Sequence, residues 1–266
     1  MRLLACATTT VTAAALALSA LAAPAHATVP AAVPAAGPAT GPATGPARSV
    51  YGFAWADGKG HLRIVPKKAV RETRRTYALK TLPGARELRL DYTGAAYTRV
   101  TVACDLKETE GRVAVDAKGL GRTKCATEDL TDTLGLGPVP VRVEHRDGRA
   151  TRVSEILAGA WPDPRTARGT IKRVNDTTVL FTTGGKRIKL GYSYTTTFHR
   201  TTATCGAGWL SGRPVNADRK GLGKKSCQWT DLTKALKTVR HPVLVKVDYT
   251  PGVDSLNEVW EVFGDA

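Results

Sequence analysis

Hydrophobic and polar residues alternate in short segments along most of the chain, and glycine-rich turns separate these segments. Leu88–Tyr92 and Val100–Cys104 show the alternation in one part of the chain, and Thr201–Cys205 and Val259–Val262 show it in another. A period of two places every second side chain on the same face, which is the pattern of a half-buried strand. The chain is therefore expected to be mostly β, with many short strands.

One motif occurs twice, and it divides this pattern into two repeats. Lys118–Gly121 reads Lys-Gly-Leu-Gly, and the same four residues recur at Lys220–Gly223, 102 positions later. A cysteine and an Asp-Leu-Thr triplet follow both copies at the same offset, at Cys125 and Asp129–Thr131 and at Cys227 and Asp231–Thr233. Conserved order and spacing over this length indicate a tandem duplication.

The order of strands and glycine turns predicts an all-β fold with minor α content. We expect two tandem small five-stranded, OB-like β-barrels, each with a short helical turn, at Glu128–Leu134 and at Trp229–Leu236. Lys67–Lys80 has no counterpart in the second repeat and is expected to be an inserted loop or short helix. The predicted divisions are a signal peptide (1–27), a Pro/Ala/Gly-rich linker (28–48), β repeat 1 (49–157), an inter-repeat linker (158–168) and β repeat 2 (169–266).

Repeat 2 also looks like the small OB-like β-barrel repeats of some bacterial secreted proteins. The likeness rests on Gly169–Asp176, the Gly184-Gly185 turn, Asp231-Leu232 and Asn257–Val259. It implies a barrel with a face that can bind a ligand. It carries over no functional residue, and the cysteine-bearing segment departs from it.

The first 27 residues have the features of a secretory signal peptide. Arg2 supplies the positive start, Val11–Ala23 is rich in Ala and Leu, and Ala25–Ala27 offers an Ala-x-Ala site, so cleavage is expected after Ala27. No later stretch approaches the roughly 20 apolar residues that a membrane-spanning helix needs. We therefore expect a secreted bacterial protein without a transmembrane segment, in which the linker is a solvated spacer.

Four cysteines remain in the predicted mature chain: Cys104, Cys125, Cys205 and Cys227. An even number in an exported chain favours disulfides. Of the three possible pairings, the duplication selects Cys104–Cys125 and Cys205–Cys227, because each pair then lies within one copy. A zinc site is the rival interpretation, but it lacks the Cys-x-x-Cys spacing. Neither a metal nor another cofactor is expected.

The chain is strongly basic in both repeats. Lysine and arginine outnumber aspartate and glutamate by 39 to 23, which gives a formal net charge of +16. Residues 49–157 carry 20 basic and 14 acidic side chains, and residues 169–266 carry 15 and 8. A general preference for anionic partners therefore belongs to the repeat and not to one tail of the chain.

Basic residues gather around both copies of the glycine turn: Lys118, Arg122, Lys124, Lys220, Lys224 and Lys225. We take these six as candidate anion-binding residues, because the backbone amides of a glycine turn and several cations together suit an anion. In the structural alternative, the glycines only permit a tight turn that delivers the second cysteine. The motif is too short for a phosphate loop of a nucleotide-binding protein.

No residue is assigned a catalytic role. His145, between Glu144 and Arg146, is a candidate base, but no serine lies in a Gly-x-Ser-x-Gly motif. We therefore expect a non-enzymatic protein that binds an anionic envelope or extracellular polymer, such as teichoic acid, nucleic acid or an acidic glycan. Two alternatives stay open. One is an inhibitor that binds a protein, for instance a protease, through a disulfide-held loop; the other is a hydrolase.

Overall fold

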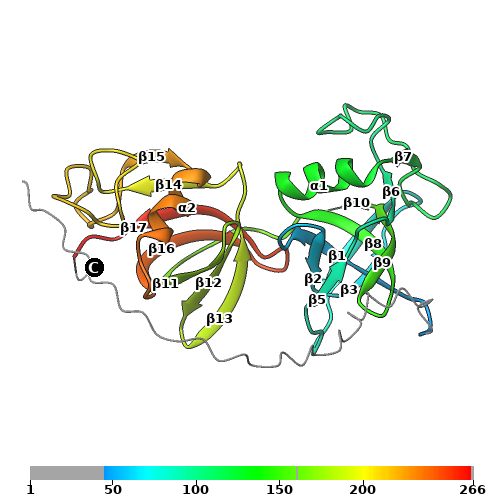
Figure 1. The fold of residues 1–266 in the computed structure, drawn as a ribbon, viewed down its shortest axis with the longest axis horizontal. Coiled ribbons are helices and arrows are strands. Elements are labelled where there is room, and N and C mark those ends of the chain that lie inside the picture. The colour runs from blue at the N-terminus through cyan, green and yellow to red at the C-terminus, as the bar shows by residue number, and fades with distance from the viewer. Residues whose placement is uncertain (1–44, 160, 265–266) are drawn as a thin grey trace, which may run out of the picture. The chain divides into compact units, whose positions relative to one another are not determined.

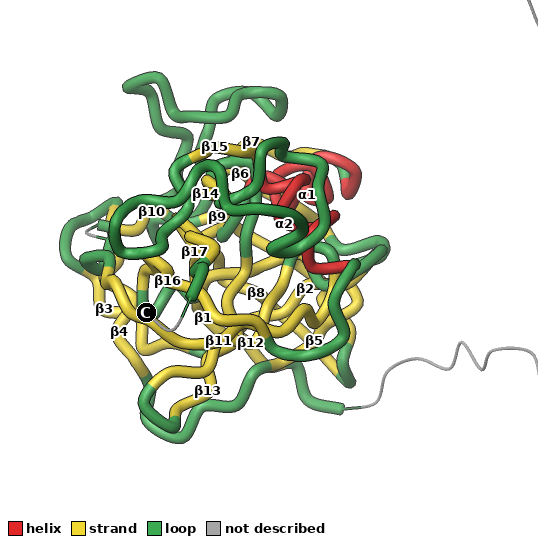
Figure 2. The backbone as a smooth tube through the Cα atoms, turned by 90° about the vertical axis from the view of Figure 1, so that its left-hand side faces the viewer, coloured by secondary structure: helices red, strands yellow, loops and turns green. Residues whose placement is uncertain are grey.

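The computed structural model describes residues 45–159 and 161–264, which fall within one compact unit, Ala43–Ala266. The fold is mostly β, with two helices, and Figure 2 shows strands, in yellow, as the main regular structure. The predicted signal peptide and residues 28–44 of the predicted linker lie outside the described residues. Neither described helix is long and apolar enough to cross a membrane.

Five strands close the first barrel: β1 (Arg48–Ala56), β2 (His61–Ile64), β5 (Leu88–Asp91), β9 (Arg149–Glu155) and β8 (Val139–Arg146). Because β8 returns to pair with β1, the ring has no free edge (Figure 1). Outside the ring, β6 (Ala96–Arg99) runs parallel to β9 and pairs with β7 (Thr123–Cys125). Helix α1 (Thr127–Leu136) follows β7 almost directly.

The second barrel repeats this order with β11 (Arg165–Asn175), β12 (Thr178–Thr183), β13 (Lys186–Gly191), β17 (Ser255–Glu261) and β16 (Val243–Thr250). The strands β14 (Thr197–Arg200) and β15 (Lys225–Gln228) and the helix α2 (Trp229–Lys237) take the places of β6, β7 and α1. The first residues of β11 lie within the predicted inter-repeat linker (158–168). The predicted fold of two tandem five-stranded barrels, each with a short helix, is confirmed.

Each barrel has its own hydrophobic core, and its helix contributes two leucines to that core. In the first barrel, Leu130 and Leu134 of α1 join the buried side chains Leu62, Ile64, Val141, Val143 and Val153. In the second barrel, Leu232 and Leu236 of α2 join Ile171, Phe181, Leu190, Val245 and Val259. The alternating strands predicted from the sequence therefore supply the inward-facing positions, and the helix completes the burial of apolar surface.

A tyrosine hydroxyl holds each helix at the same point. The Oη atom of Tyr92 lies 3.0 Å from Oγ1 of Thr131, and that of Tyr192 lies 3.0 Å from Oγ1 of Thr233. Burial raises the pKa of Tyr192 to about 12, so this phenol stays protonated and can donate a hydrogen bond at physiological pH. The matched contacts show that the duplication extends to the helix attachment.

A buried arginine–glutamate ion pair also occurs once in each barrel. Arg99 Nε lies 2.9 Å from Glu155 Oε1, and Arg200 Nη2 lies 2.8 Å from Glu261 Oε1. The side chains of the second pair are fully buried, and those of the first pair are nearly so. Buried charges are tolerated only when both partners are present and further hydrogen bonds satisfy them.

Hydrogen bonds from these pairs organise the loop that carries the first cysteine of each barrel. Arg99 Nη1 donates to the carbonyls of Cys104 (2.5 Å) and Leu106 (2.7 Å). Arg200 Nη1 donates in the same way to Cys205 (2.7 Å) and Ala207 (2.6 Å). The arginine fork thus holds the backbone of a loop that has no strand partner of its own.

The predicted strands Val100–Cys104 and Thr201–Cys205 are wrong. The strands β6 and β14 end at Arg99 and Arg200, and the following residues bend away from the sheet. The cause is the buried glutamate, because Glu155 Oε2 accepts the Val100 amide and Glu261 Oε2 accepts the Thr201 amide, each at 2.9 Å. A side-chain acceptor therefore replaces the strand ladder at this point.

The expected loop or short helix at Lys67–Lys80 is also wrong. This segment forms an antiparallel hairpin of β3 (Lys67–Arg71) and β4 (Thr76–Thr81), with β3 paired to β1. The short strand β10 (Leu157–Ala158) adds to β4 in parallel. Apolar side chains at alternate positions of the hairpin, Ala69, Tyr77 and Leu79, pack with Tyr51 and Ile156, which explains the strand conformation.

We expect Glu261→Gln to lower the free energy of unfolding by about 3–5 kcal/mol, because it leaves the fully buried Arg200 without its counter-charge. Glu258→Gln is the matched control on the same strand, since its carboxylate is 43% exposed and pairs with His199. An exposed pair contributes roughly 0–1 kcal/mol. Urea titration of both variants measures the difference, and equal unfolding midpoints would contradict the structural role assigned to Glu261.

Candidate functional site

The duplicated glycine turn is built on an aspartate that precedes it by two residues. Asp116 Oδ1 accepts the amides of Lys118 (2.7 Å) and Leu120 (2.9 Å). Asp218 Oδ1 accepts those of Lys220 and Leu222, both at 2.8 Å. The sequence analysis missed these aspartates, although they are identical in both copies and lie at the same 102-residue offset. The full motif is therefore Asp-x-Lys-Gly-Leu-Gly.

All four backbone amides of the turn have partners within the chain. Besides the two that bind the aspartate carboxylate, Gly119 N donates to Asp116 O (3.0 Å) and Gly121 N donates to Glu155 O (2.9 Å). The second copy matches, because Gly221 N donates to Asp218 O and Gly223 N to Glu261 O. The expectation that turn amides help to bind an anion is wrong, and anion binding here must rest on side chains.

The backbone geometry explains why both glycines of each turn are needed. Gly119 and Gly221 have φ values of 76° and 73°, in the left-handed region that glycine tolerates. Gly121 packs on the neighbouring strand so closely that a Cβ atom would lie 2.5 Å from the carbonyl carbon of Arg99. Since Gly223 meets the backbone of Arg200 in the same manner, both copies need glycine at this position.

The surroundings of Asp218 in the turn favour its ionised carboxylate. The Leu222 amide is the main cause that holds the pKa of Asp218 below its ordinary value, and the Lys220 amide and the charges of Lys220 and Lys224 act in the same direction. The carboxylate therefore stays ionised over the whole neutral and mildly acidic range.

The six candidate residues do not converge on one groove. Lys118 and Lys220 occupy equivalent exposed positions in the turns, and Arg122 and Lys224 are exposed just after them. Lys124 and Lys225 are not equivalent. Lys124 is exposed on β7, whereas the half-buried Lys225 pairs across the ladder with Arg200, and Ser226 occupies the position that matches Lys124. Successive strand residues face opposite sides, so these two lysines point to different surfaces.

In the second barrel the turn lysine joins two further cations that the sequence analysis missed. A depression of about 320 Å³ is lined by Thr166, Ala167, Arg168, Lys220, Leu222 and Lys246. Arg168 of β11 and Lys246 of β16 are direct cross-strand partners. Neither belongs to a motif, and only the pairing of β11 with β16 reveals that they share a surface with Lys220.

An aromatic row continues from this depression across the sheet. Lys246 Nζ lies 4.5 Å from the ring centroid of Trp260, and the His199 ring stacks on Trp260 with centroids 4.9 Å apart and planes inclined by 8°. His199 Nε2 in turn lies 2.8 Å from Glu258 Oε2. Both neighbours are cross-strand partners of Trp260, so strand register sets the row. At the matching positions of the first barrel stand Arg142, Ser154 and Thr98.

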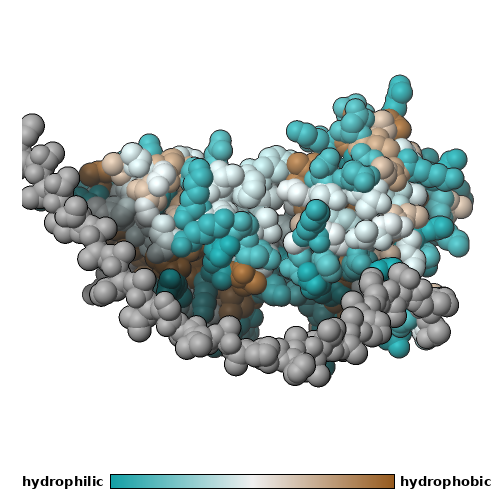
Figure 3. All heavy atoms as spheres, in the orientation of Figure 1, coloured by the Kyte–Doolittle hydropathy of each residue, from teal (hydrophilic) through white to brown (hydrophobic). Residues whose placement is uncertain are grey.

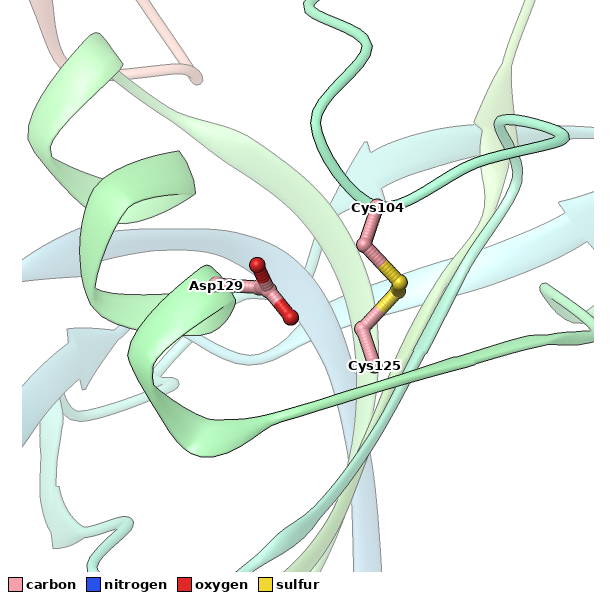
Figure 4. A group of neighbouring side chains, drawn as sticks. All are labelled: Cys104, Cys125 and Asp129. Atoms are coloured by element: carbon pink, nitrogen blue, oxygen red, sulfur yellow. A yellow bond between two sulfur atoms is a disulfide. The ribbon is translucent and has the colours of Figure 1, made fainter.

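The predicted disulfides Cys104–Cys125 and Cys205–Cys227 are both present, with Cα–Cα distances of 5.6 Å. Each joins the arginine-held loop to the short strand, β7 or β15, that precedes a helix. Asp129, in the first turn of α1, extends toward the first disulfide (Figure 4), and its carboxylate and both sulfur atoms lie within 4.8 Å of one another. Asp231 has the same place in the second barrel. Sulfur atoms bonded to each other are not the thiolates that bind metals.

Two histidines, His145 and His199, lack contact with a candidate nucleophile among the residues that the structure describes. Burial, together with the charge of Arg48, lowers the pKa of His145, which favours the neutral ring. In residues 45–159 and 161–264 no hydrogen bond joins His145 or His199 to a hydroxyl or thiol that could act as a nucleophile. Such a bond is the first geometric requirement of a Ser–His or Cys–His pair.

Comparison with protein-family models, with curated proteins and with solved structures finds no match for this chain. The functional inference therefore depends on the basic surfaces beside the duplicated turns.

We expect Asp129→Asn to speed the reduction of Cys104–Cys125 by dithiothreitol. The carboxylate near both sulfur atoms repels the attacking thiolate and disfavours a thiolate product. Two unit charges about 4 Å apart in water repel by about 1 kcal/mol, which corresponds to a roughly fivefold change in rate. Alkylation at timed intervals, followed by mass spectrometry, measures the rate.

Asparagine keeps an oxygen that can accept the Ala126 amide, which Asp129 Oδ2 now accepts at 2.8 Å, so the helix start is preserved. Glu128→Gln is the control, because it removes an exposed acid from the same helical turn. If both variants are reduced at the wild-type rate, Asp129 does not protect the disulfide.

Proposed function

We propose that this protein is a secreted, non-enzymatic basic protein that binds an anionic envelope or extracellular polymer. The observation that carries the proposal is the depression in the second barrel, where Lys220 of the duplicated turn meets Arg168 and Lys246. Three cations on three separate elements of a closed barrel share one surface. The first barrel presents the equivalent turn lysine, Lys118, together with Arg122.

The charges of these residues are available to a ligand. Within the described part of the chain, no ion pair engages the six candidate residues, Arg168 or Lys246. Figure 3 shows many hydrophilic side chains on the face that it presents. Because the turn amides are already satisfied, we expect recognition by long, flexible cationic side chains, which read charge more than shape.

A polymer suits such surfaces better than a small ion. Each exposed cation contributes little alone, but several contacts along one polyanion release several condensed counter-ions together, so affinity becomes appreciable and steeply dependent on salt. Teichoic acid, nucleic acid and acidic glycans all share this property. The expected ligand is therefore a polyanion, and the binding experiment identifies its charged group.

We place the protein outside the cell. Two disulfides favour an oxidising compartment, and residues 1–27 have the pattern of a signal peptide.

We expect the mature protein to be retained on an anionic matrix at ~50 mM salt, where screening is weak. The triple variant Arg168→Gln, Lys220→Gln, Lys246→Gln should elute at lower salt. In nucleic-acid complexes each phosphate contact contributes roughly 0.7–0.9 to the slope of log affinity against log salt, so loss of three contacts predicts a slope smaller by about 2–3.

The charge-matched control replaces three exposed cations outside the depression, Lys186, Arg187 and Lys234, with glutamine. Equal weakening by both triple variants would show that net charge alone acts and that the depression is no site. Absence of retention of the wild-type protein would overturn the proposed function, and tight, salt-insensitive inhibition of a protease would favour the inhibitor alternative.

A further inference from the structure

The hairpin that distinguishes the first barrel lies directly on its glycine turn. The hydroxyl of Tyr77 in β4 donates to the carbonyl of Lys118. Gly119 lies beneath the hairpin, where a Cβ atom would approach the Tyr77 ring to 3.1 Å and the Arg75 carbonyl oxygen to 3.4 Å. The hairpin and the turn, which meet through residues 41 positions apart in sequence, therefore form one surface.

Arg71 fixes the tip of the hairpin in this position. Its Nη2 atom donates to the carbonyl of Arg74 (2.8 Å) within the hairpin and to that of Ala117 (2.5 Å) in the turn. Thr73 Oγ1 accepts the amides of Arg75 and Thr76, both at 3.1 Å, which orders the backbone between the strands. The exposed side chains of Arg74 and Arg75 thus stand on a constrained backbone.

Between the hairpin and the turn lies a depression of about 520 Å³, lined by Arg71, Arg74, Arg75, Val115, Asp116 and Ala117. Three arginines and one aspartate are among its lining residues. The carboxylate of Asp116 already accepts the amides of Lys118 and Leu120. Mutual repulsion of three neighbouring cations is unfavourable, and none of the ion pairs among the described residues involves these three arginines.

We propose that Arg74 and Arg75 form a clamp in the first barrel for an oxyanion that has at least two free oxygen atoms. The inference rests on the proposed function and names the group of the polymer that this barrel binds. A guanidinium presents planar, paired N–H donors that match a phosphate diester, a sulfate ester or a carboxylate, and a lysine ammonium cannot reproduce this geometry. Arg71 serves the fold of the hairpin and is not part of the clamp.

The two barrels therefore bind anions differently. Within the described residues the second barrel has no hairpin equivalent to β3–β4, and its depression is lined by two lysines and one arginine. The second barrel recognises an anion by its charge, whereas the clamp also recognises how the oxygen atoms of the anion are oriented. Among the described residues only the first barrel places adjacent arginines against the turn.

The test compares three variants of the full mature protein by calorimetric titration at ~50 mM salt. The double variant Arg74→Lys, Arg75→Lys keeps both positive charges but removes the two planar guanidinium groups. The double variant Arg74→Gln, Arg75→Gln removes the charges as well as the guanidinium groups. Lys80→Gln, Arg86→Gln is the charge-matched control, since both side chains are exposed and line neither depression. The probes are poly(glycerol phosphate), a sulfated polysaccharide and polygalacturonate, which distinguish phosphate, sulfate and carboxylate as the bound group.

We expect the lysine pair to bind the preferred polymer about tenfold more weakly, the glutamine pair more weakly still, and the control within about twofold of the wild type. Melting temperatures should be unchanged, because the replaced side chains are exposed. Wild-type affinity in the lysine pair would overturn the clamp, as would equal losses in the glutamine pair and the control. If the wild-type protein binds none of the three polymers, the clamp is refuted, and the proposed function fails as well if the protein is not retained on the anionic matrix. If it binds one polymer and the arginine variants bind equally well, only the clamp is refuted.

Discussion

The buried arginine–glutamate pair is the contact on which the other features of each barrel depend. The glutamate carboxylate ends β6 or β14, because it accepts a hydrogen bond from the first backbone amide after the strand. The backbone carbonyl of the same glutamate accepts a hydrogen bond from the amide of the last glycine in the turn. The arginine holds the loop that carries the first cysteine. One pair of side chains therefore sets the strand end, the loop, the disulfide and the turn together. Its burial makes this arrangement intolerant of losing either partner.

The duplicated frame supports two different surfaces. Both barrels share the ion pair, the disulfide, the aspartate-built turn and the tyrosine that holds the helix. The two barrels differ at solvent-facing strand positions and in the β3–β4 hairpin, and these differences leave the buried ion pair in place. Arg142, Ser154 and Thr98 in the first barrel thus stand where Lys246, Trp260 and His199 form a row in the second. Under the proposed function, a rigid frame with variable outer positions allows the two barrels to bind one class of ligand through different surfaces.

The sequence predicts the fold well wherever the evidence is local or repeated. Alternation located the closing strands, and the 102-residue offset paired the cysteines correctly. The sequence pattern could not reveal the ion pair of Arg99 with Glu155, because the two residues lie 56 positions apart. Each alone resembles a solvated charge in an alternating strand. For the same reason Val100–Cys104 was predicted as a strand, although its first amide bonds to a carboxylate. Arg168 and Lys246 were missed because only the barrel topology makes them neighbours.

The glycine turn shows why pattern and chemistry must be separated. Glycines flanked by lysines suggest an anion cradle made of backbone amides, yet the aspartate and the glutamate carbonyl already accept every amide from Lys118 to Gly121. A turn of this kind can hold its lysine in place without touching the ligand itself. Under the proposed function, the ligand is then bound by side chains. Long side chains discriminate poorly between orientations of the ligand unless a second element of the fold fixes the backbone that carries them. In the first barrel the hairpin is that element, which is the physical reason to place the more selective site there.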